Sequence, residues 1–148
     1  EVQTILFEHN HTDSFTLDQR KVLVAEDNEI NMLVIREFLK RWNIQIFEAV
    51  NGEEAIAFFR ERNDIDLALL DLQMPEVDGY EVLEWLKKNK SDIPAIAFTA
   101  SLLDGQDKTH LLELGFHDVV AKPFSPTELE AKLKLALSKN YTQPGFAA

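Results

Sequence analysis

Five short apolar segments alternate with amphipathic segments along most of the chain, and this alternation constrains the fold more than any other feature. The apolar segments lie near 21–25, 44–49, 66–70, 93–98 and 118–121. Helical patterns follow them near 29–42, 53–61, 80–89, 104–114 and 126–138. Strands separated by helices predict a flavodoxin-like, doubly wound α/β fold with a five-stranded parallel sheet. Right-handed crossovers place helices on both of its faces.

Local signals mark several helix boundaries. Asn28 and Ser125 are good N-caps, and Pro126 suits the first helical position. Asn51-Gly52 predicts a turn, and Gly115 is typical of the residue after a helix end. These signals support the alternation of strands and helices.

Charged residues lie where three of the predicted strands end. Glu26 and Asp27 follow the first strand, Asp71 follows the third and Lys122 follows the fifth. In the order 2-1-3-4-5 the first and third strands are neighbours, and ligands bind beyond the carboxyl ends of such strands. An all-oxygen cluster suits Mg²⁺. The sequence therefore predicts a small pocket in which a metal and a lysine hold a phosphoryl group.

Composition excludes several other classes. The chain has 148 residues and is 45% apolar, which predicts one domain with a substantial core. A net charge of -11 disfavours direct binding to nucleic acid. Cysteine is absent, so disulfides and thiolate metal sites are excluded, and we expect a cytoplasmic setting. We find no apolar run long enough to cross a membrane and no secretory signal at the start.

The chain divides into three parts. We expect an N-terminal arm or linker over 1–20, a domain over 21–138 and a C-terminal tail over 139–148. The tripeptide His9-Asn10-His11 resembles a metal-nuclease motif, but its surroundings lack the hairpin and helix of such sites. Because the first residue is Glu1 and not Met, we expect a fragment of a larger protein or a processed product.

Four motifs, each at the end of a predicted strand, resemble those of response regulator receiver domains in two-component signalling. They are Val24-Ala25-Glu26-Asp27-Asn28, Leu70-Asp71-Leu72-Gln73-Met74-Pro75 with Asp78-Gly79, Phe98-Thr99-Ala100, and Ala121-Lys122-Pro123-Phe124. Each motif alone is weak, but four in order are specific. The resemblance covers about 21–138.

The resemblance implies a role for each matching residue. Asp71 is the expected phosphoacceptor, and it would take a phosphoryl group from a partner phosphohistidine. Glu26, Asp27, Asp71 and the backbone carbonyl of Gln73 are the expected ligands of Mg²⁺, for which Mn²⁺ can substitute. The domain would thus catalyse its own phosphorylation and a slow autodephosphorylation, which Gln73 and Ser101 are placed to tune.

Three further features concern the switch. Thr99 is the hydroxyl expected to bond the phosphoryl group, and Lys122 is expected to pair with one of its oxygens. Lys122-Pro123 resembles a cis peptide bond of the family. Val119 replaces the usual aromatic residue, so an aromatic rotamer switch is disfavoured. We expect output through shifts of the fourth helix and nearby loops.

The motifs Glu26-Asp27-Asn28-Glu29-Ile30-Asn31 and Leu72-Gln73-Met74-Pro75 are similar to those of receivers in hybrid histidine kinases. The expected partners are a histidine kinase domain, a histidine phosphotransfer domain, or both. We expect such a partner to contact the first helix through Met32, Ile35 and Arg36. In that setting the full protein would be a kinase.

A second surface is the face of the fourth helix, fifth strand and fifth helix, which the family uses for dimers or output. Leucines are numerous there, at Leu102, Leu103, Leu111 and Leu112. We expect most of them to pack on the sheet, and a homodimer through this face is the alternative. His110 and His117 are expected at the surface, and Trp42 and Trp85 are expected to be partly buried.

Other functions remain open. One is a pseudo-receiver that binds proteins without being phosphorylated. A haloacid-dehalogenase-like phosphatase is disfavoured because Gln73 stands where that family has its general acid. A flavodoxin-like FMN carrier is disfavoured because Glu26-Asp27-Asn28-Glu29 would repel phosphate.

Overall fold

The computed structural model describes residues 17–100 and 105–138. Its strands are β1 (Lys21–Ala25), β2 (Gln45–Ala49), β3 (Leu67–Asp71), β4 (Ala95–Thr99) and β5 (Asp118–Ala121). Its helices are α2 (Glu29–Arg41), α3 (Gly52–Glu61), α4 (Gly79–Asn89), α5 (Gly105–Leu114) and α6 (Pro126–Leu137). The alternation predicted from the sequence is confirmed.

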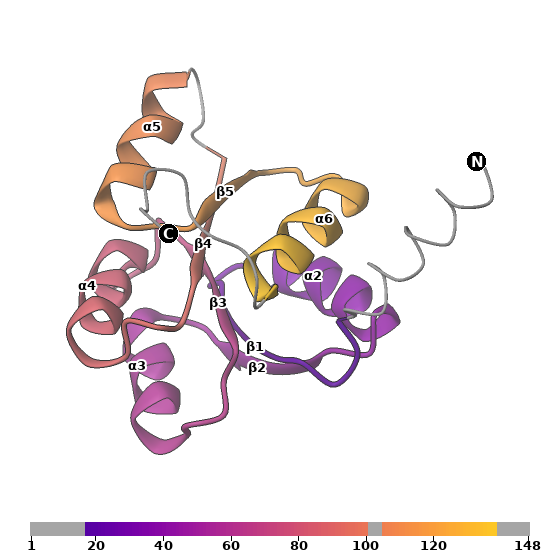
Figure 1. The fold of residues 1–148 in the computed structure, drawn as a ribbon, viewed down its shortest axis with the longest axis horizontal. Coiled ribbons are helices and arrows are strands. Elements are labelled where there is room, and N and C mark those ends of the chain that lie inside the picture. The colour runs from indigo at the N-terminus through magenta and orange to yellow at the C-terminus, as the bar shows by residue number, and fades with distance from the viewer. Residues whose placement is uncertain (1–16, 101–104, 139–148) are drawn as a thin grey trace.

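The strands form one parallel sheet in the order β2-β1-β3-β4-β5, as predicted. Figure 1 shows α2 and α6 on one side of the sheet and α3, α4 and α5 on the other. The first and third strands pair directly, with Ala25 opposite Leu70. The strand ends that carry the candidate site are therefore neighbours.

Alternation along the strands divides the interior into two cores. Side chains on one face of the sheet pack under α2 and α6, as Val24, Leu69 and Phe98 do. Side chains on the other face pack under α3, α4 and α5, as Leu70 and Ala97 do. All five residues of β3 and of β4 are buried. These buried strands, apolar up to their last residues, fit a parallel sheet that is covered on both faces.

Side-chain caps begin α2 and α6, as the sequence indicated. Asn28 Oδ1 accepts a hydrogen bond from Asn31 N at 2.9 Å, and Ser125 caps α6. Asp78 and Glu81 form a reciprocal capping box at the start of α4. The turn expected at Asn51-Gly52 is instead the N-cap and first residue of α3. Gly52 packs there against the backbone of Val77, where a Cβ would lie 2.2 Å from the carbonyl oxygen.

Lysine side chains bind backbone carbonyls at two helix ends. Lys87 Nζ in α4 donates to Leu114 O at the end of α5, at 2.8 Å. Lys90 Nζ donates to Arg62 O at 2.8 Å and to Phe59 O at the end of α3. Cations are favourable at helix C-termini, where carbonyl groups lack intrahelical partners. These contacts join neighbouring helices on one side of the sheet.

Two residues are less exposed than the sequence suggested. Leu17, within the segment assigned to the arm, is 3% exposed in the core under α2 and α6. His117, expected at the surface, is partly buried, and burial lowers its pKa against a smaller opposing effect of Asp118. His110 is exposed, and Trp42 and Trp85 are partly buried, as predicted.

Some expectations lie outside the described residues: His9-Asn10-His11, Ser101, Leu102, Leu103 and the tail over 139–148. Within the described ranges, none of the helices has the length and apolarity needed to span a bilayer.

Candidate functional site

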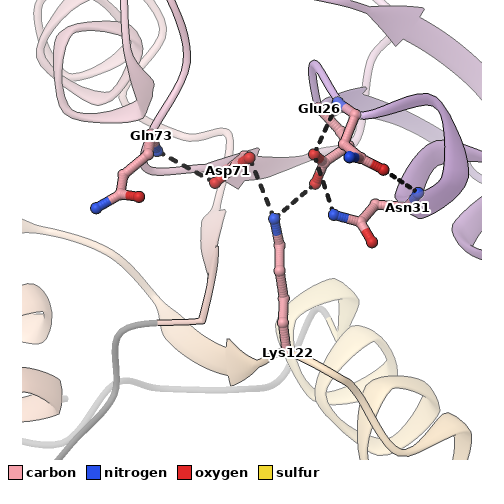
Figure 2. A network of polar contacts seen from close by, with 6 residues as sticks. Glu26, Asn31, Asp71, Gln73 and Lys122 are labelled. Carbon is pink, nitrogen blue, oxygen red and sulfur yellow. Dashed lines mark hydrogen bonds and ion pairs between the residues drawn. The ribbon is translucent and has the colours of Figure 1, made fainter.

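The alternation of side-chain direction along the strands determines where the charged residues of the site lie. Each lies two positions beyond a buried residue of the α2 and α6 face: Glu26 after Val24, Asp71 after Leu69, and Lys122 after Val120. Because alternate side chains along a strand point the same way, the three side chains extend from one face where the strands end. Figure 2 shows Lys122 reaching between Asp71 and Glu26.

Three carboxylates gather at this point. Glu26, Asp27 and Asp71 each offer an oxygen atom, and these atoms lie within 4.8 Å of one another. Lys122 Nζ lies 2.8 Å from Glu26 Oε1 and 3.1 Å from Asp71 Oδ2. Glu26 is 1% exposed and Asp71 is 5% exposed, whereas Asp27 is exposed. The structure thus brings together the charged side chains that the sequence singled out.

Backbone and amide groups hold the two buried carboxylates. Asn28 N donates to Glu26 Oε2 at 3.1 Å, and Asn31 Nδ2 approaches the same oxygen at 3.5 Å. Gln73 N donates to Asp71 Oδ1 at 3.1 Å, and the Gln73 residue is otherwise exposed (Figure 2). Both carboxylates therefore have fixed orientations before any ligand binds.

Burial and charge perturb the protonation of the site. Burial raises the pKa of Asp71, and the nearby charge of Glu26 adds to this effect, while Gln73 N and Lys122 oppose it. Burial works to lower the pKa of Lys122, but its contacts with Glu26 and Asp71 outweigh burial and raise it. The cluster is therefore short of positive charge, and Lys122 stays protonated.

The donor set fits a hard divalent cation. Carboxylate oxygens from three residues converge, and Asp27 opens the cluster to solvent. Mg²⁺ binds in this way, through a few carboxylates and several waters. A divalent cation would also offset both burial and the charge of Glu26, which together raise the pKa of Asp71.

Thr99 ends β4 beside the cluster. It is 3% exposed, and its carbonyl oxygen accepts a hydrogen bond from Lys122 N at 2.9 Å. The Lys122-Pro123 peptide bond is cis, as predicted. Val119 is 1% exposed in the core under α3, α4 and α5. A small, buried side chain therefore occupies the position at which the resemblance leads us to expect an aromatic residue.

Gly79 and Phe98 occur in the predicted motifs, but the sequence assigned neither of them a role at the site. Gly79 lies so close to Asp71 that a Cβ would sit 2.4 Å from the Asp71 carbonyl oxygen. Phe98 lies under Lys122, with its ring centroid 4.9 Å from Lys122 Nζ. The sequence could have predicted the direction of Phe98, because it lies two residues after Ile96 and therefore points to the same face of the sheet. Close backbone approach at Gly79 has no local signal of that kind.

An apolar surface adjoins the cluster. Ile30, Leu33 and Val34 of α2 are 72%, 49% and 40% exposed. A cavity of about 330 Å³ lies beside them, and its lining includes Leu33, Asp27 and Val50.

Met32 and Ile35, which we expected to contact a partner, are 5% and 0% exposed. That expectation is wrong for both, because they occupy the helix face that packs on the sheet. Arg36 is partly exposed and forms a two-point ion pair with Glu48, at 2.5 and 2.9 Å.

The face formed by α5, β5 and α6 is partly apolar. Leu111 is 4% exposed, whereas Leu112 and Leu135 are 41% and 44% exposed. On β5 and α6, Lys132 Nζ lies 3.5 Å from Asp118 Oδ1 and 3.0 Å from Glu128 Oε2.

Comparison with known proteins agrees with this geometry. The sequence model of the family described as "Response regulator receiver domain" matches residues 22–134. The chain is 39% identical over 123 residues to "Probable transcriptional regulator ycf27" of Porphyridium aerugineum, covering 83% of this chain and 50% of that protein. The chain spans about half the length of the curated relatives it matches.

Solved structures share the fold. The receiver domain of the Francisella response regulator 1452 has a TM-score of 0.70 at 32% identity, over 80% of this chain and 97% of that one. The receiver domain of a sensor histidine kinase from Pseudomonas aeruginosa has a TM-score of 0.72 at 30% identity, over 80% of this chain and 98% of that one. That structure carries a magnesium ion in its active site cleft.

Proposed function

We propose that this chain, which belongs to the response regulator receiver domain family, accepts a phosphoryl group on Asp71 in a two-component phosphorelay. The observation that carries the proposal is the setting of Asp71. Its buried carboxylate ends the central strand, 3.1 Å from Lys122 Nζ and beside Glu26 and Asp27. Such a carboxylate is fixed, close to a cation and open on the side of Asp27.

The proposed reaction moves one phosphoryl group between two side chains. An oxygen of Asp71 forms a bond to phosphorus while the bond from phosphorus to the donor histidine nitrogen breaks, and that nitrogen keeps the electron pair. Lys122 contacts a phosphoryl oxygen, since its point charge suits phosphate. The Thr99 hydroxyl then binds another phosphoryl oxygen, and this movement starts the switch.

We assign the metal ligands to Glu26, Asp27, Asp71 and the backbone carbonyl of Gln73, with Glu26 bound through water. Mg²⁺ is the proposed ion, and Mn²⁺ can replace it. When bound, the cation neutralises the carboxylates and the phosphoryl oxygens. The magnesium ion of the Pseudomonas aeruginosa receiver supports the assignment.

The proposed phosphodonor is a histidine kinase or histidine phosphotransfer domain. The exposed apolar side chains of Ile30, Leu33 and Val34 suit a helix bundle that presents its phosphohistidine toward Asp71. A homodimer through α5, β5 and α6 is a second interaction, and exposed Leu112 and Leu135 favour it.

Two wider settings are compatible with a receiver, both with the domain in the cytoplasm. Several curated relatives are named "Probable transcriptional regulator ycf27", whereas the Pseudomonas aeruginosa domain belongs to a sensor histidine kinase. The hybrid-kinase setting rests on the sequence motifs around Glu26 and Gln73. Phosphotransfer profiling against purified histidine kinases and phosphotransfer domains distinguishes the two settings by the preferred donor.

The test of the phosphoacceptor is intact mass after incubation with Mg²⁺ and acetyl phosphate. We expect the wild type to gain one phosphoryl group and Asp71→Asn to gain none. Asp66→Asn is the matched control, because Asp66 is a partly buried carboxylate that, like Asp71, accepts a backbone hydrogen bond, from Lys21 N at 2.9 Å. Decay of the modified mass measures the slow autodephosphorylation.

Each outcome has a clear meaning. Modification of Asp71→Asn would show that another residue is the acceptor. If neither acetyl phosphate nor any phosphohistidine donor modified the wild type, the pseudo-receiver alternative would replace this proposal. A phosphatase is disfavoured because the exposed residue two positions after Asp71 is Gln73, which cannot act as a general acid.

A further inference from the structure

We propose that Phe98 is a positioning residue, and that the face of its ring holds the ammonium group of Lys122 at the carboxylate cluster. The inference rests on the proposed phosphoacceptor function of the same site and adds a residue to it. Lys122 Nζ lies 4.9 Å from the centroid of the Phe98 ring. Cations are attracted to the negative face of an aromatic ring at such distances.

Packing fixes the orientation of the ring. Phe98 is 2% exposed, and its ring meets Phe124 edge to face, with centroids 5.7 Å apart and planes at 61°. Phe124 in turn meets Phe38 of α2 at 5.7 Å and 82°. Because Phe124 follows Lys122 by two residues, one short segment supplies both the cation and the ring that braces its support.

The backbone adds a second link between the same two segments. Lys122 N donates to Thr99 O, so the backbone of Lys122 is joined to the residue after Phe98. Lys122 Nζ lies over the Phe98 ring and also contacts Glu26 Oε1 and Asp71 Oδ2. Phe98 therefore contacts the charged end of the lysine, in addition to the backbone link at Thr99.

An uncharged support has a specific advantage during phosphoryl transfer. In the structure, carboxylates hold Lys122, but the proposed reaction engages these same carboxylates with metal and phosphorus. The ring face stays in place when those partners change. Since it carries no net charge, it leaves the full charge of Lys122 available to a phosphoryl oxygen.

The test alters the electrons of the ring and preserves its shape. Phe98 is replaced by phenylalanine carrying one, two or three ring fluorines, which progressively weaken the attraction of the ring face for a cation. We expect the rate of phosphorylation by acetyl phosphate with Mg²⁺ to fall stepwise. Complete loss of the contact is expected to slow it about threefold to thirtyfold. Phe116 is the control, because it is also 2% exposed but packs edge to face with Tyr80 in the opposite core.

A second measurement does not need phosphorylation. The ε-methylene protons of Lys122 should show an upfield ring-current shift in the NMR spectrum of the wild type, and Phe98→Leu should remove it. A fluorine series at Phe98 that leaves the rate unchanged, or changes it no more than the Phe116 series, would overturn the positioning role. An unshifted Lys122 signal would also overturn it. If the wild type is not phosphorylated at all, the phosphoacceptor proposal fails instead, and the NMR shift still tests the contact.

Discussion

Replacing Lys122 by Met should destabilise the metal-free domain strongly. The change keeps the length of the side chain but removes the cation between Glu26 and Asp71, whose side chains are 1% and 8% exposed. At an effective dielectric constant of about 20, charges about 3 Å apart attract by about 5.5 kcal/mol. Like charges within 4.8 Å of each other repel by at least about 3.5 kcal/mol. After desolvation is included, removal of one partner from a buried ion pair costs about 3–5 kcal/mol.

The loss should depend on pH in a definite direction. The pKa of Asp71 is already raised in the folded chain, and Lys122 opposes that rise, so Lys122→Met raises it further. A group with a raised pKa in the folded state stabilises the fold below its ordinary pKa. That stability is lost as the pH rises through the folded value. The difference between wild type and variant should therefore be largest at neutral pH and should shrink as the pH falls through the folded pKa of Asp71.

Urea denaturation in EDTA at several pH values measures this difference. Lys134→Met is the control, because the Lys134 ion pair with Glu130 is 3.5 Å long and more than a third exposed on both sides, and we expect a change under about 1 kcal/mol. Mg²⁺ should restore much of the stability of Lys122→Met, since it supplies positive charge to the same carboxylates. Equal stability of wild type and Lys122→Met at neutral pH, or a loss independent of pH, would refute the reasoning.

Three further substitutions test the surroundings of the site. Asp78→Ala removes the capping box of α4 and should lower the free energy of unfolding by about 1 kcal/mol in urea. Gly79→Ala places a Cβ 2.4 Å from Asp71 O, so phosphorylation by acetyl phosphate should slow by about tenfold to a hundredfold; an unchanged rate would contradict this close approach. Lys90→Met leaves Phe59 O and Arg62 O at the end of α3 without their ammonium partner and should cost about 1–3 kcal/mol, with the phosphorylation rate of the folded protein unchanged.

Much of the fold could be predicted because its signals are local. Asn28 and Ser125 cap helices with their own side chains, so their positions in the sequence mark the boundaries directly. Asn51-Gly52 predicts a turn, whereas the close backbone of Val77, which requires a glycine there, comes from a distant loop. Leu17 likewise packs in a core cluster whose other members lie further along the chain.

The candidate site was predictable to the extent that strand ends define it. Asp71 ends β3, and Glu26 and Lys122 directly follow β1 and β5, so the strand order brings them together. The contact surface expected on α2 was predicted less well, because apolar residues occupy both the buried and the exposed side of this helix. Met32 and Ile35 face the sheet, whereas Ile30, Leu33 and Val34 are exposed.

Core side chains and site side chains point to the same face of the sheet, and this also limits how the chain can change in length. Val24 and Glu26 lie two residues apart and point to the same face of the sheet, and so do Leu69 and Asp71. A single-residue insertion or deletion within β1 or β3 would turn both the core side chains and the carboxylates to the other face of the sheet. Natural variants of the domain should therefore differ in length in the loops that precede the strands, and the strand segments that end at Glu26 and Asp71 should keep a constant length.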